Sequence, residues 1–375
     1  MNNVFGTILR VDLSSGKIEK EPISESMRRN YGGGRGINSR ILFDETGPNV
    51  EPLSPENRLI FASGPLSGTA APSAARFTVS TKSPLTGILG DANGGGRFGP
   101  AMKRAGIDHI IVQGKADKPV YIFIDDDKVT INSAAHLWGK NVREIETLIK
   151  EDLGDSRIRI ASIGPAGENL VKIASITHED RSASRTGVGA VMGSKNLKAI
   201  AIRGTQKVKL FDPDAFNCLA RDLNLRMGAS NAFDHFRKFG GIAGLAMSNQ
   251  GGFLAVRNFE QTGEFEHIDK YDAQKVVDQY YDGSRPCFSC PIGCGNKFKV
   301  RYGPYAGEWG YKIEEGAFNP LGPVCGNSDV GSIFKMNNMA NHFGIDLIEF
   351  GQGMSVVMEW FEKGLFLKKI WMVFP

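Results

Sequence analysis

The first half of the chain alternates short apolar runs with glycine-containing turns. Runs rich in Val, Ile, Phe and Thr predict strands at residues 4–13, 58–64, 75–83, 109–115, 120–132, 157–164, 170–177 and 197–204. Few of the segments between these runs show a helical pattern. The sequence therefore predicts a strand-dominated domain over residues 1–210.

From about residue 211 the apolar residues recur three and four positions apart, which is the spacing of an amphipathic helix. Asp212 and Pro213 suit the cap and first turn of a helix over 214–227, and the same spacing recurs over 272–283 and 329–344. Cys218 falls on the first of these patterns, where a buried free thiol is expected. The predicted fold class is thus α+β, with a β-sheet-rich base domain followed by an α-helical domain over residues 211–375.

Composition narrows the function classes. A chain of 375 residues with 41% hydrophobic and 23% charged residues can bury more than one core, and its formal charge of +4 is too small to indicate a nucleic-acid partner. The start of the chain lacks the pattern of a signal peptide, and no run of apolar residues is long enough to cross a membrane. The sequence predicts a cytoplasmic protein with no membrane partner.

Three of the five cysteines lie close together in the stretch "RPCFSCPIGCGNKF". Cys287, Cys290 and Cys294 form a C-x2-C-x3-C spacing bounded by prolines and glycines, which suits a metal or cluster site better than a disulfide framework. Three sulfurs wrapped around one corner favour an iron–sulfur cluster, because zinc sites more often use two C-x2-C pairs. Zinc and unliganded structural cysteines remain as alternatives.

Glycine, with 46 residues, gathers in four clusters at 31–38, 63–69, 90–100 and 181–195. An isolated glycine-rich turn is usually only a turn, but the last three clusters each lie near an arginine or lysine. Backbone N–H groups and cations together can bind phosphate-like oxygens. The stretch "GGGRGIN" is not a dinucleotide fingerprint, because an isoleucine stands where the last glycine should be.

Several stretches of the sequence, taken together, resemble one known protein family. "GGGRGIN", "ARFTVSTKSPLTGILGDANGGGRFGPAMKRAGIDHIIVQGKADKPVYI", "GVGAVMGSKNLKAIAIRG" and the cysteine spacing resemble the aldehyde ferredoxin oxidoreductase family of tungsten enzymes, from about residue 3 to residue 365. The resemblance implies a tungsten atom, or molybdenum, held by two pterins on a β-sheet base domain beneath two helical domains. It also implies a [4Fe–4S] cluster near one pterin and transfer of electrons to ferredoxin or another electron-transfer subunit. A magnesium ion bridging the pterin phosphates and a homodimer are compatible with it.

The resemblance assigns roles to particular residues. The three clustered cysteines would bind the cluster, and a fourth ligand would lie beyond position 375. The family's pterin motif at the end of a helix reads "NHFGID" here, so that Asn341 replaces the first aspartate and Asp346 is retained. Further pterin contacts are implied at Arg76, Asn93, Gly95, Arg181, Ser182 and Arg185.

Candidate catalytic residues depart from the family pattern. Gly316 stands where aldehyde-oxidising members carry a glutamate, and Glu314 and Glu315 are displaced from that position. Cys325 is either a small buried residue or a thiolate ligand of tungsten, as in the related class II benzoyl-CoA reductases. His267, in an acidic stretch, is either a proton donor or part of a solvated loop.

The end of the chain, "LKKIWMVFP", has no helix or cap pattern, which predicts a truncated or frame-shifted form without the third, helical domain and of doubtful activity. The leading functional hypothesis for the family member is oxidation of an aldehyde to a carboxylic acid. Reduction of an aromatic acyl-CoA such as benzoyl-CoA is the alternative within the family. An iron–sulfur electron carrier and a zinc-stabilised module are the alternatives from other classes.

Overall fold

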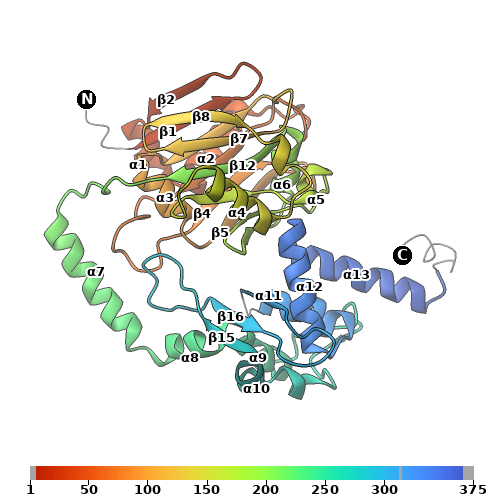
Figure 1. Ribbon diagram of the computed structural model, residues 1–375. Helices are drawn as coiled ribbons and strands as arrows, with labels where there is room; N and C mark the ends of the chain where they lie inside the picture. Colours follow the sequence, from red (N-terminus) through yellow and green to blue (C-terminus); the bar gives the residue numbers. More distant parts are fainter. Residues whose placement is uncertain (1–5, 312–314, 366–375) are drawn as a thin grey trace. The chain divides into compact units, whose positions relative to one another are not determined.

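The computed structural model describes residues 6–311 and 315–365, and the chain divides into two compact units. Unit 1 comprises Met1–Ala229, Pro286–Pro291 and Asn341–Asp346, and unit 2 comprises Ser230–Arg285, Ile292–Ala340 and Leu347–Pro375. Most of unit 1 lies in the red-to-green part of the colour scale of Figure 1. The two short segments that belong to unit 1 carry part of the cysteine motif and the whole of the predicted pterin motif, Asn341–Asp346.

Unit 1 contains two six-stranded sheets, in which the pairs β1–β6 and β7–β12 are parallel and the other pairs antiparallel. The first sheet has the order β2 (Ile18–Pro22), β1 (Thr7–Asp12), β6 (His109–Gln113), β3 (Leu59–Ser63), β4 (Phe77–Lys82), β5 (Leu89–Gly94). The second has the order β11 (Arg181–Ala183), β10 (Ile176–His178), β9 (Arg159–Ser162), β12 (Leu197–Arg203), β7 (Val120–Asp125), β8 (Lys128–Ser133).

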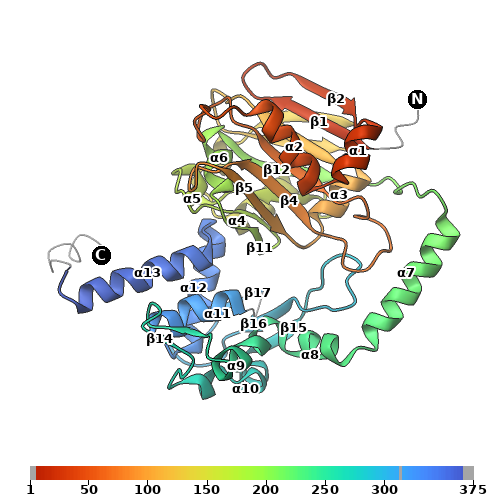
Figure 2. The ribbon, with the colours of Figure 1, turned by 180° about the vertical axis from the view of Figure 1, so that it is seen from behind.

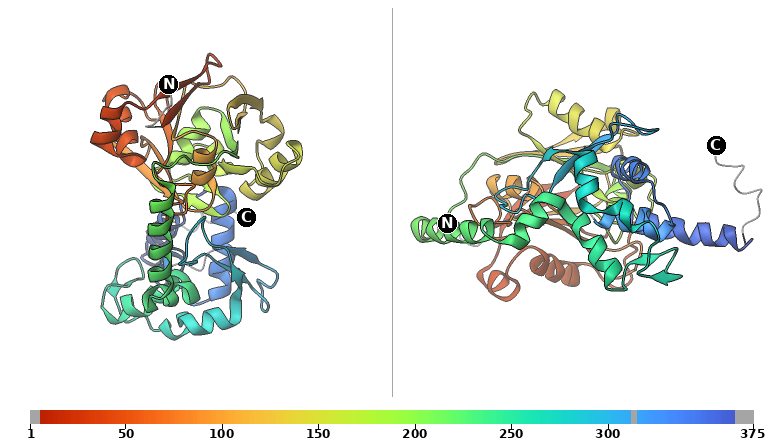
Figure 3. Two further views of the ribbon diagram at one scale, coloured as in Figure 1. Left: turned by 90° about the vertical axis from the view of Figure 1, so that its left-hand side faces the viewer. Right: turned by 90° about the horizontal axis from the view of Figure 1, so that it is seen from below.

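Successive residues of the central strands enter different cores. Leu59 and Phe61 of β3 join a large core that both sheets share with α3 (Phe98–Arg104) and α6 (Val188–Ser194), whereas Ile60 packs with α2 (Arg35–Glu45). The second sheet is also covered on both faces, because the residues that point away from the shared core pack with α4 (Val142–Asp152). In Figures 2 and 3 the orange-red α2 and the yellow-green α4 lie on opposite sides of the strands. Strands covered on both faces read as continuous apolar runs, which is why the sequence revealed them.

The predicted apolar runs all coincide with or overlap strands, so these predictions are confirmed. Strands β2, β5 and β11 were not predicted. Each is an outer strand of its sheet, with the polar or glycine-rich sequences "IEKEP", "LGDANG" and "RSA". Unit 1 also contains more helix than expected, including α1 (Glu25–Tyr31) and α5 (Pro165–Glu168).

The predicted helix near residue 214 is α7 (Pro213–Gly228). The Asp212 side chain accepts a hydrogen bond from the Ala215 N–H, and Pro213 occupies the first turn, as predicted. The expectation that Cys218 is buried is wrong, because its side chain is exposed and Ala220 is the residue that this helix buries. An amphipathic pattern shows which face of a helix is apolar but not whether another element covers that face.

Unit 2 is mainly helical, with α8 (Asn231–Phe239), α9 (Ala243–Gln250), α10 (Ala273–Tyr280), α11 (Glu315–Leu321), α12 (Val330–Phe343) and α13 (Leu347–Glu362). Its core centres on stacked aromatic rings, with the Phe298 and Phe334 centroids 4.0 Å apart. It also contains the strand pair β13 (Ala255–Val256) and β14 (Gln261–Thr262), and a three-stranded sheet of β15 (Tyr281–Ser284), β16 (Asn296–Lys299) and β17 (Trp309–Tyr311). Because β15 pairs with β16, the cysteine motif is the loop of a β-hairpin.

Candidate metal and cofactor site

The open end of the β4–β5 pair carries two of the predicted pterin residues. Arg76 directly precedes β4, and Asn93 lies on β5 opposite Thr78. Arg76 Nε donates to Asn93 Oδ1 at 2.5 Å, and Nη2 donates to the Asn93 carbonyl at 3.3 Å. The exposed guanidinium is therefore fixed on one side, and its other N–H groups can still bind an anion.

The turn that follows β5 brings the backbone against a thiol. A Cβ at Gly95 would lie 2.8 Å from Cys287 Sγ, so only glycine leaves room for the sulfur. The Gly96 N–H donates to the same sulfur at 3.2 Å, and Gly96 has a φ of +98°, which favours glycine. The third glycine cluster of the sequence thus packs against the first cysteine of the motif.

Cys290 lies in the same part of unit 1. The Cys290 N–H donates to the Cys287 carbonyl at 3.3 Å, and its sulfur lies 3.3 Å from Ser73 Oγ. The loop is fixed further, because the Ser73 N–H donates to the Ser289 carbonyl at 2.9 Å and the Phe288 N–H donates to the Gly96 carbonyl at 3.2 Å. N–H and O–H groups that point at sulfur stabilise thiolates and tune clusters that thiolates bind.

The third cysteine belongs by its contacts to unit 2. Cys294 lies between Gly293, whose carbonyl accepts a bond from Ser284 Oγ at 3.2 Å, and Gly295, whose carbonyl accepts from the Arg285 N–H at 2.6 Å. Within residues 6–311 and 315–365, the His, Cys, Asp and Glu side chains form no group of three or more arranged to hold a metal ion. Within unit 1, the N–H and O–H groups around Cys287 and Cys290 fit two thiolate ligands of an iron–sulfur cluster.

A buried acidic turn lies beside the glycine turn. Glu179 and Asp180 connect β10 to β11 with φ values of +50° and +57°, as in the tight turn of a two-residue hairpin. Both side chains are buried, and arginines compensate their charges: Arg159 lies 2.8 Å from Glu179, and Arg143 lies 3.3 Å from Asp180. Such a strained turn persists only where the surrounding residues hold it.

His178, at the end of β10, connects this hairpin to the glycine turn. Its Nδ1 lies 2.7 Å from the Ile160 carbonyl and therefore carries the proton, while Nε2 accepts the Arg97 N–H at 3.2 Å. The ring also lies where a Cβ at Gly96 would be, 2.8 Å from Cδ2. The sequence alone indicated no role for His178 or for the acidic turn, because only the fold brings the "HED" stretch beside residues 95–97.

The structure brings together the predicted pterin residues that are distant in sequence. Ser182 Oγ donates to Asn341 Oδ1 at 3.2 Å, across 159 positions of the chain. The Arg185 N–H donates to Asp346 Oδ2 at 2.8 Å, and the Asp346 N–H donates to the Ile173 carbonyl at 2.9 Å. Asp346 is buried, so its carboxylate holds the backbone turn that presents the exposed Arg185.

Arg181 contacts the neighbouring turns. Its side chain is buried, and its Nη1 donates to the Glu179 carbonyl at 3.4 Å. Its Cδ lies 3.4 Å from the position of a Cβ at Gly95. Arg181 and Gly95 therefore belong to one arrangement, together with Cys287.

The predicted catalytic residues lie in unit 2, and in the described part of the chain no hydrogen bond or ion pair joins any two of them. Glu315 begins α11 and accepts a bond from Ser248 Oγ at 3.2 Å. His267 is 38% exposed, and its Nε2 lies 3.6 Å from Glu266 Oε1. Glu314 lies outside the described residues.

Cys325 ends a short 3-10 helix, Pro323–Cys325, and is partly buried. Its thiol donates to the carbonyls of Pro320 at 3.2 Å and Gly351 at 3.4 Å. Burial raises the pKa of the thiol to about 11. In the metal-free chain this environment favours the neutral thiol.

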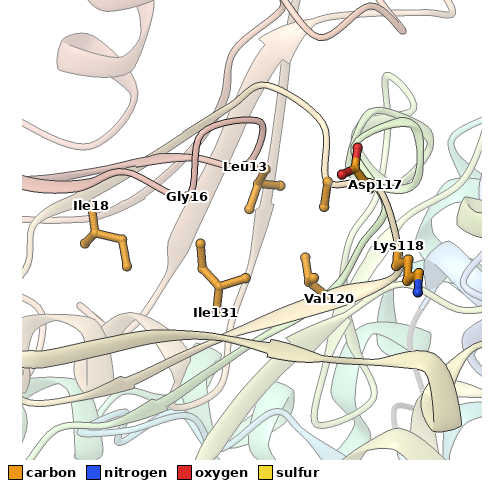
Figure 4. A pocket seen from close by; sticks show the side chains of 8 residues that line it. Leu13, Gly16, Ile18, Asp117, Lys118, Val120 and Ile131 are labelled. Atoms are coloured by element: carbon orange, nitrogen blue, oxygen red, sulfur yellow. The ribbon is translucent and has the colours of Figure 1, made fainter.

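A separate hollow of unit 1 carries no candidate chemistry. It has a volume of about 540 Å³ and a largely aliphatic lining that includes Leu13, Ile18, Val120 and Ile131. In Figure 4 the Ile18, Ile131 and Val120 side chains point into the hollow, with Asp117 and Lys118 at one end. None of the predicted cofactor residues lines this hollow.

Comparison with known proteins places these features in a family. Residues 8–204 match the N-terminal domain of aldehyde ferredoxin oxidoreductase, and residues 219–372 match domains 2 and 3 of the same enzyme. The chain belongs to the aldehyde ferredoxin oxidoreductase family. This confirms both the resemblance and the α+β fold class predicted from the sequence.

Four relatives at 42–43% identity are tungsten-containing enzymes by name. The chain is 43% identical to the tungsten-containing aldehyde ferredoxin oxidoreductase of Pyrococcus horikoshii, over 97% of this chain and 60% of the relative. It is also 43% identical to the Pyrococcus furiosus protein of the same name, over 96% and 59%. The chain therefore spans about three fifths of the length of these relatives.

A solved structure shows the same fold. It is the active site complex BamBC of benzoyl coenzyme A reductase with 1,5-dienoyl-CoA, and it matches with a TM-score of 0.86 at 31% identity, over 98% of this chain and 57% of that chain.

No helix within the described residues is both long enough and apolar enough to cross a bilayer.

Proposed function

We propose that the protein is the cofactor-binding part of a tungsten-pterin oxidoreductase that oxidises aldehydes to carboxylic acids. The observation that carries the proposal is the turn Gly94–Gly96, because it follows the strand that bears Asn93 and receives the Cys287 sulfur at Gly95. Proposed pterin and cluster ligands that lie beside one short turn suit a site in which electrons would leave the metal through a cluster.

The chain's own residues would bind the cofactor as follows. Arg76, Arg181 and Arg185 would neutralise the phosphates of two pterins, and the turn at Gly95 would supply backbone donors. Asn93, Ser182 and Asn341 would donate and accept hydrogen bonds. Asp346 would keep Arg185 in place through its bond to the Arg185 backbone N–H. A magnesium ion bridging the phosphates is part of the same proposal, and Cys287, Cys290 and Cys294 would bind a [4Fe–4S] cluster.

Tungsten held by pterin dithiolenes, or molybdenum in its place, supplies a two-electron acceptor when it is bound. Oxidation of an aldehyde, with water as the source of the added oxygen atom, gives a carboxylate and releases two electrons and three protons. The chain must therefore accept protons near the substrate and pass electrons one at a time to ferredoxin or a similar carrier. Glu315 and His267 are the described candidates for the proton acceptor. In the structure Glu315 is held by Ser248, so it would have to turn from that bond to act.

Reduction of an aromatic acyl-CoA is the second candidate function. The likeness to the benzoyl coenzyme A reductase complex and the glycine at position 316 favour it. Two observations weigh against it. The identity to the aldehyde-oxidising relatives is higher, at 43% against 31%. The thiol of Cys325 is bonded as a neutral donor to two carbonyls, which does not suit a ligand of tungsten.

Metal and pterin analysis of the anaerobically purified enzyme tests the proposal. We expect about four irons and one tungsten or molybdenum per chain, with pterin released on denaturation. Iron without pterin would indicate an iron–sulfur electron carrier instead, and zinc alone would indicate a zinc-stabilised module. Turnover of simple aldehydes against turnover of an aromatic acyl-CoA would then decide between the two reactions. The proposal includes a cytoplasmic location, where thiols stay reduced, and a homodimer.

A further inference from the structure

Unit 1 contains a pocket of about 410 Å³ whose wall is unusually basic. It lies at the end of β12, beside α3 and the residues that lead into β9. No carboxylate belongs to its lining among the described residues. The lining includes one aromatic residue, Phe288, and five arginines, namely Arg97, Arg104, Arg157, Arg159 and Arg203.

Carboxylates outside the lining hold most of these arginines in place. Arg203 pairs with Asp125, and Arg157 Nη2 lies 2.9 Å from Asp155 Oδ2. Hydrogen bonds from Arg157 lower the pKa of Asp155 to about 2, so this carboxylate stays charged at any working pH.

The other arginines are held from the protein interior and by the aromatic residue. Arg159 lies 2.8 Å and Arg97 3.6 Å from the buried carboxylate of Glu179. Arg104 instead lies over the Phe288 ring, with its guanidinium carbon 4.9 Å from the centroid. Five cations face three carboxylates, so the surface keeps an excess of positive charge at fixed positions.

The aromatic wall of the pocket is part of the cysteine loop. Phe288 stands between the proposed cluster ligands Cys287 and Cys290 in the sequence, and its N–H donates to the Gly96 carbonyl at 3.2 Å. The Gly96 N–H in turn donates to Cys287 Sγ at 3.2 Å. A molecule that fills the pocket therefore touches a residue directly bonded to a proposed cluster ligand.

We propose that this arginine pocket is the docking surface for an acidic, one-electron carrier protein of the ferredoxin class. This inference rests on the proposed function, which requires such a carrier. Arginine and aromatic residues are enriched at the centres of protein interfaces, and complementary charge steers a small carrier into the right orientation. Carrier complexes form and dissociate rapidly, which suits a small contact of this kind. At each docking one electron would pass to the oxidised carrier through the cluster that Cys287, Cys290 and Cys294 would hold, so two carriers would leave reduced for each aldehyde oxidised.

Charge reversal at the edge of the pocket tests the inference. Arg104→Glu and Arg157→Glu are the test variants, because neither residue is a proposed pterin or cluster ligand. Arg29→Glu is the matched control: Arg29 is 74% exposed and pairs with one carboxylate, Glu25, just as Arg157 is 74% exposed and pairs with Asp155. The assay uses the loaded enzyme, an aldehyde, and either an acidic ferredoxin or a small dye as the electron acceptor.

We expect the KM for ferredoxin to rise on the order of tenfold in both test variants, because steering by charge raises association rates by roughly 10- to 1000-fold. Activity with the dye should stay within about twofold of the parent enzyme, and the control should match the parent in both assays. Added salt should raise the KM of the parent enzyme and have little effect on that of the variants.

An unchanged ferredoxin KM and salt dependence in both variants, with dye activity intact, would overturn the docking surface and leave the proposed function standing. Absence of dye activity in the parent enzyme would overturn the proposed function itself. Titration with inorganic phosphate gives a third result. If phosphate binds the parent tightly and not the variants, while the ferredoxin KM is unchanged, the pocket is a site for a small anion and the carrier inference is wrong.

Discussion

Replacement of Gly95 by alanine is the sharpest single test of the site, because the glycine leaves space for one sulfur. A Cβ at this position would lie 2.8 Å from Cys287 Sγ, and the next neighbour is Arg181 Cδ at 3.4 Å. Normal contact begins near 3.5 Å, so the sulfur or the turn must move by roughly 0.7 Å. No positive φ is recorded for Gly95, so alanine at this position changes packing and not backbone conformation.

The cost of this movement depends on whether the sulfur is free to rotate. Overpacking costs about 1–3 kcal/mol, and in the metal-free chain rotation about the Cys287 Cα–Cβ bond should keep the cost near the lower end. Rotation would break the bond from the Gly96 N–H, which is 3.2 Å from the sulfur. When the thiolate is fixed in a cluster the rotation is not available, and the cost should approach the upper end. We therefore expect a small change in the stability of the metal-free chain and a large loss of iron.

Gly47→Ala is the matched control, because nothing lies within 4 Å of its Cβ position and its φ is also not positive. Both substitutions lower the conformational entropy of the unfolded chain by the same amount. The difference in stability between the two variants therefore measures the effect of the contact with sulfur. Thermal unfolding of the metal-free chains measures stability, with a shift of about 2–4 °C for each kcal/mol in a unit of this size. Iron and labile sulfide after anaerobic reconstitution measure the cluster. Equal iron retention in the two variants would refute the contact between Gly95 and a cluster ligand.

Three further predictions follow from other parts of the structure. His109 is buried with Nδ1 2.8 Å from Asn38 Oδ1, and burial lowers its pKa to about 4 from an ordinary 6.5. The neutral ring therefore contributes to the free energy of unfolding above pH 6.5, and this contribution is lost as the pH falls to 4. The loss should reach about 3 kcal/mol in denaturant titrations of the parent chain, and the same slope in His109→Gln would contradict it. Cys325→Ser should cost about 1–2 kcal/mol and leave the electron paramagnetic signal of the metal unchanged, whereas a changed signal would make Cys325 a tungsten ligand. Arg76→Ala should lower the pterin content of the purified enzyme while Arg29→Ala does not, and equal pterin in both would remove Arg76 from the site.

Much of the fold was readable from the sequence because burial leaves a clear pattern. The central strands are covered on both faces, so residues such as Ile60 and Phe61 are apolar in succession and form an unmistakable run. Of the outer strands of the two sheets, β2, β5 and β11 were not predicted, whereas β8 overlaps the predicted run 120–132. Strand β5 contains Asn93 and Gly94, and a Cβ at Gly94 would lie 2.7 Å from the buried Phe77 ring. Sequences rich in asparagine and glycine look like turns, so no apolar run marks this strand.

Part of the candidate site could likewise be predicted from the sequence, and the rest could not. The thiol spacing is local, so the sequence by itself predicted a cluster bound by Cys287, Cys290 and Cys294, which stays a prediction. Local patterns do not show which distant residues meet, and only the tertiary structure brought Ser182 to Asn341.

The acidic turn of Glu179 and the arginine pocket depended wholly on the fold. Their members lie on separate elements and loops, with Arg104 and Phe288 separated by about half of the chain. The physical reason is that charge and hydrogen bonding act over a few ångströms in space. Sequence spacing therefore predicts partners within one helix or loop, and packing decides all the others.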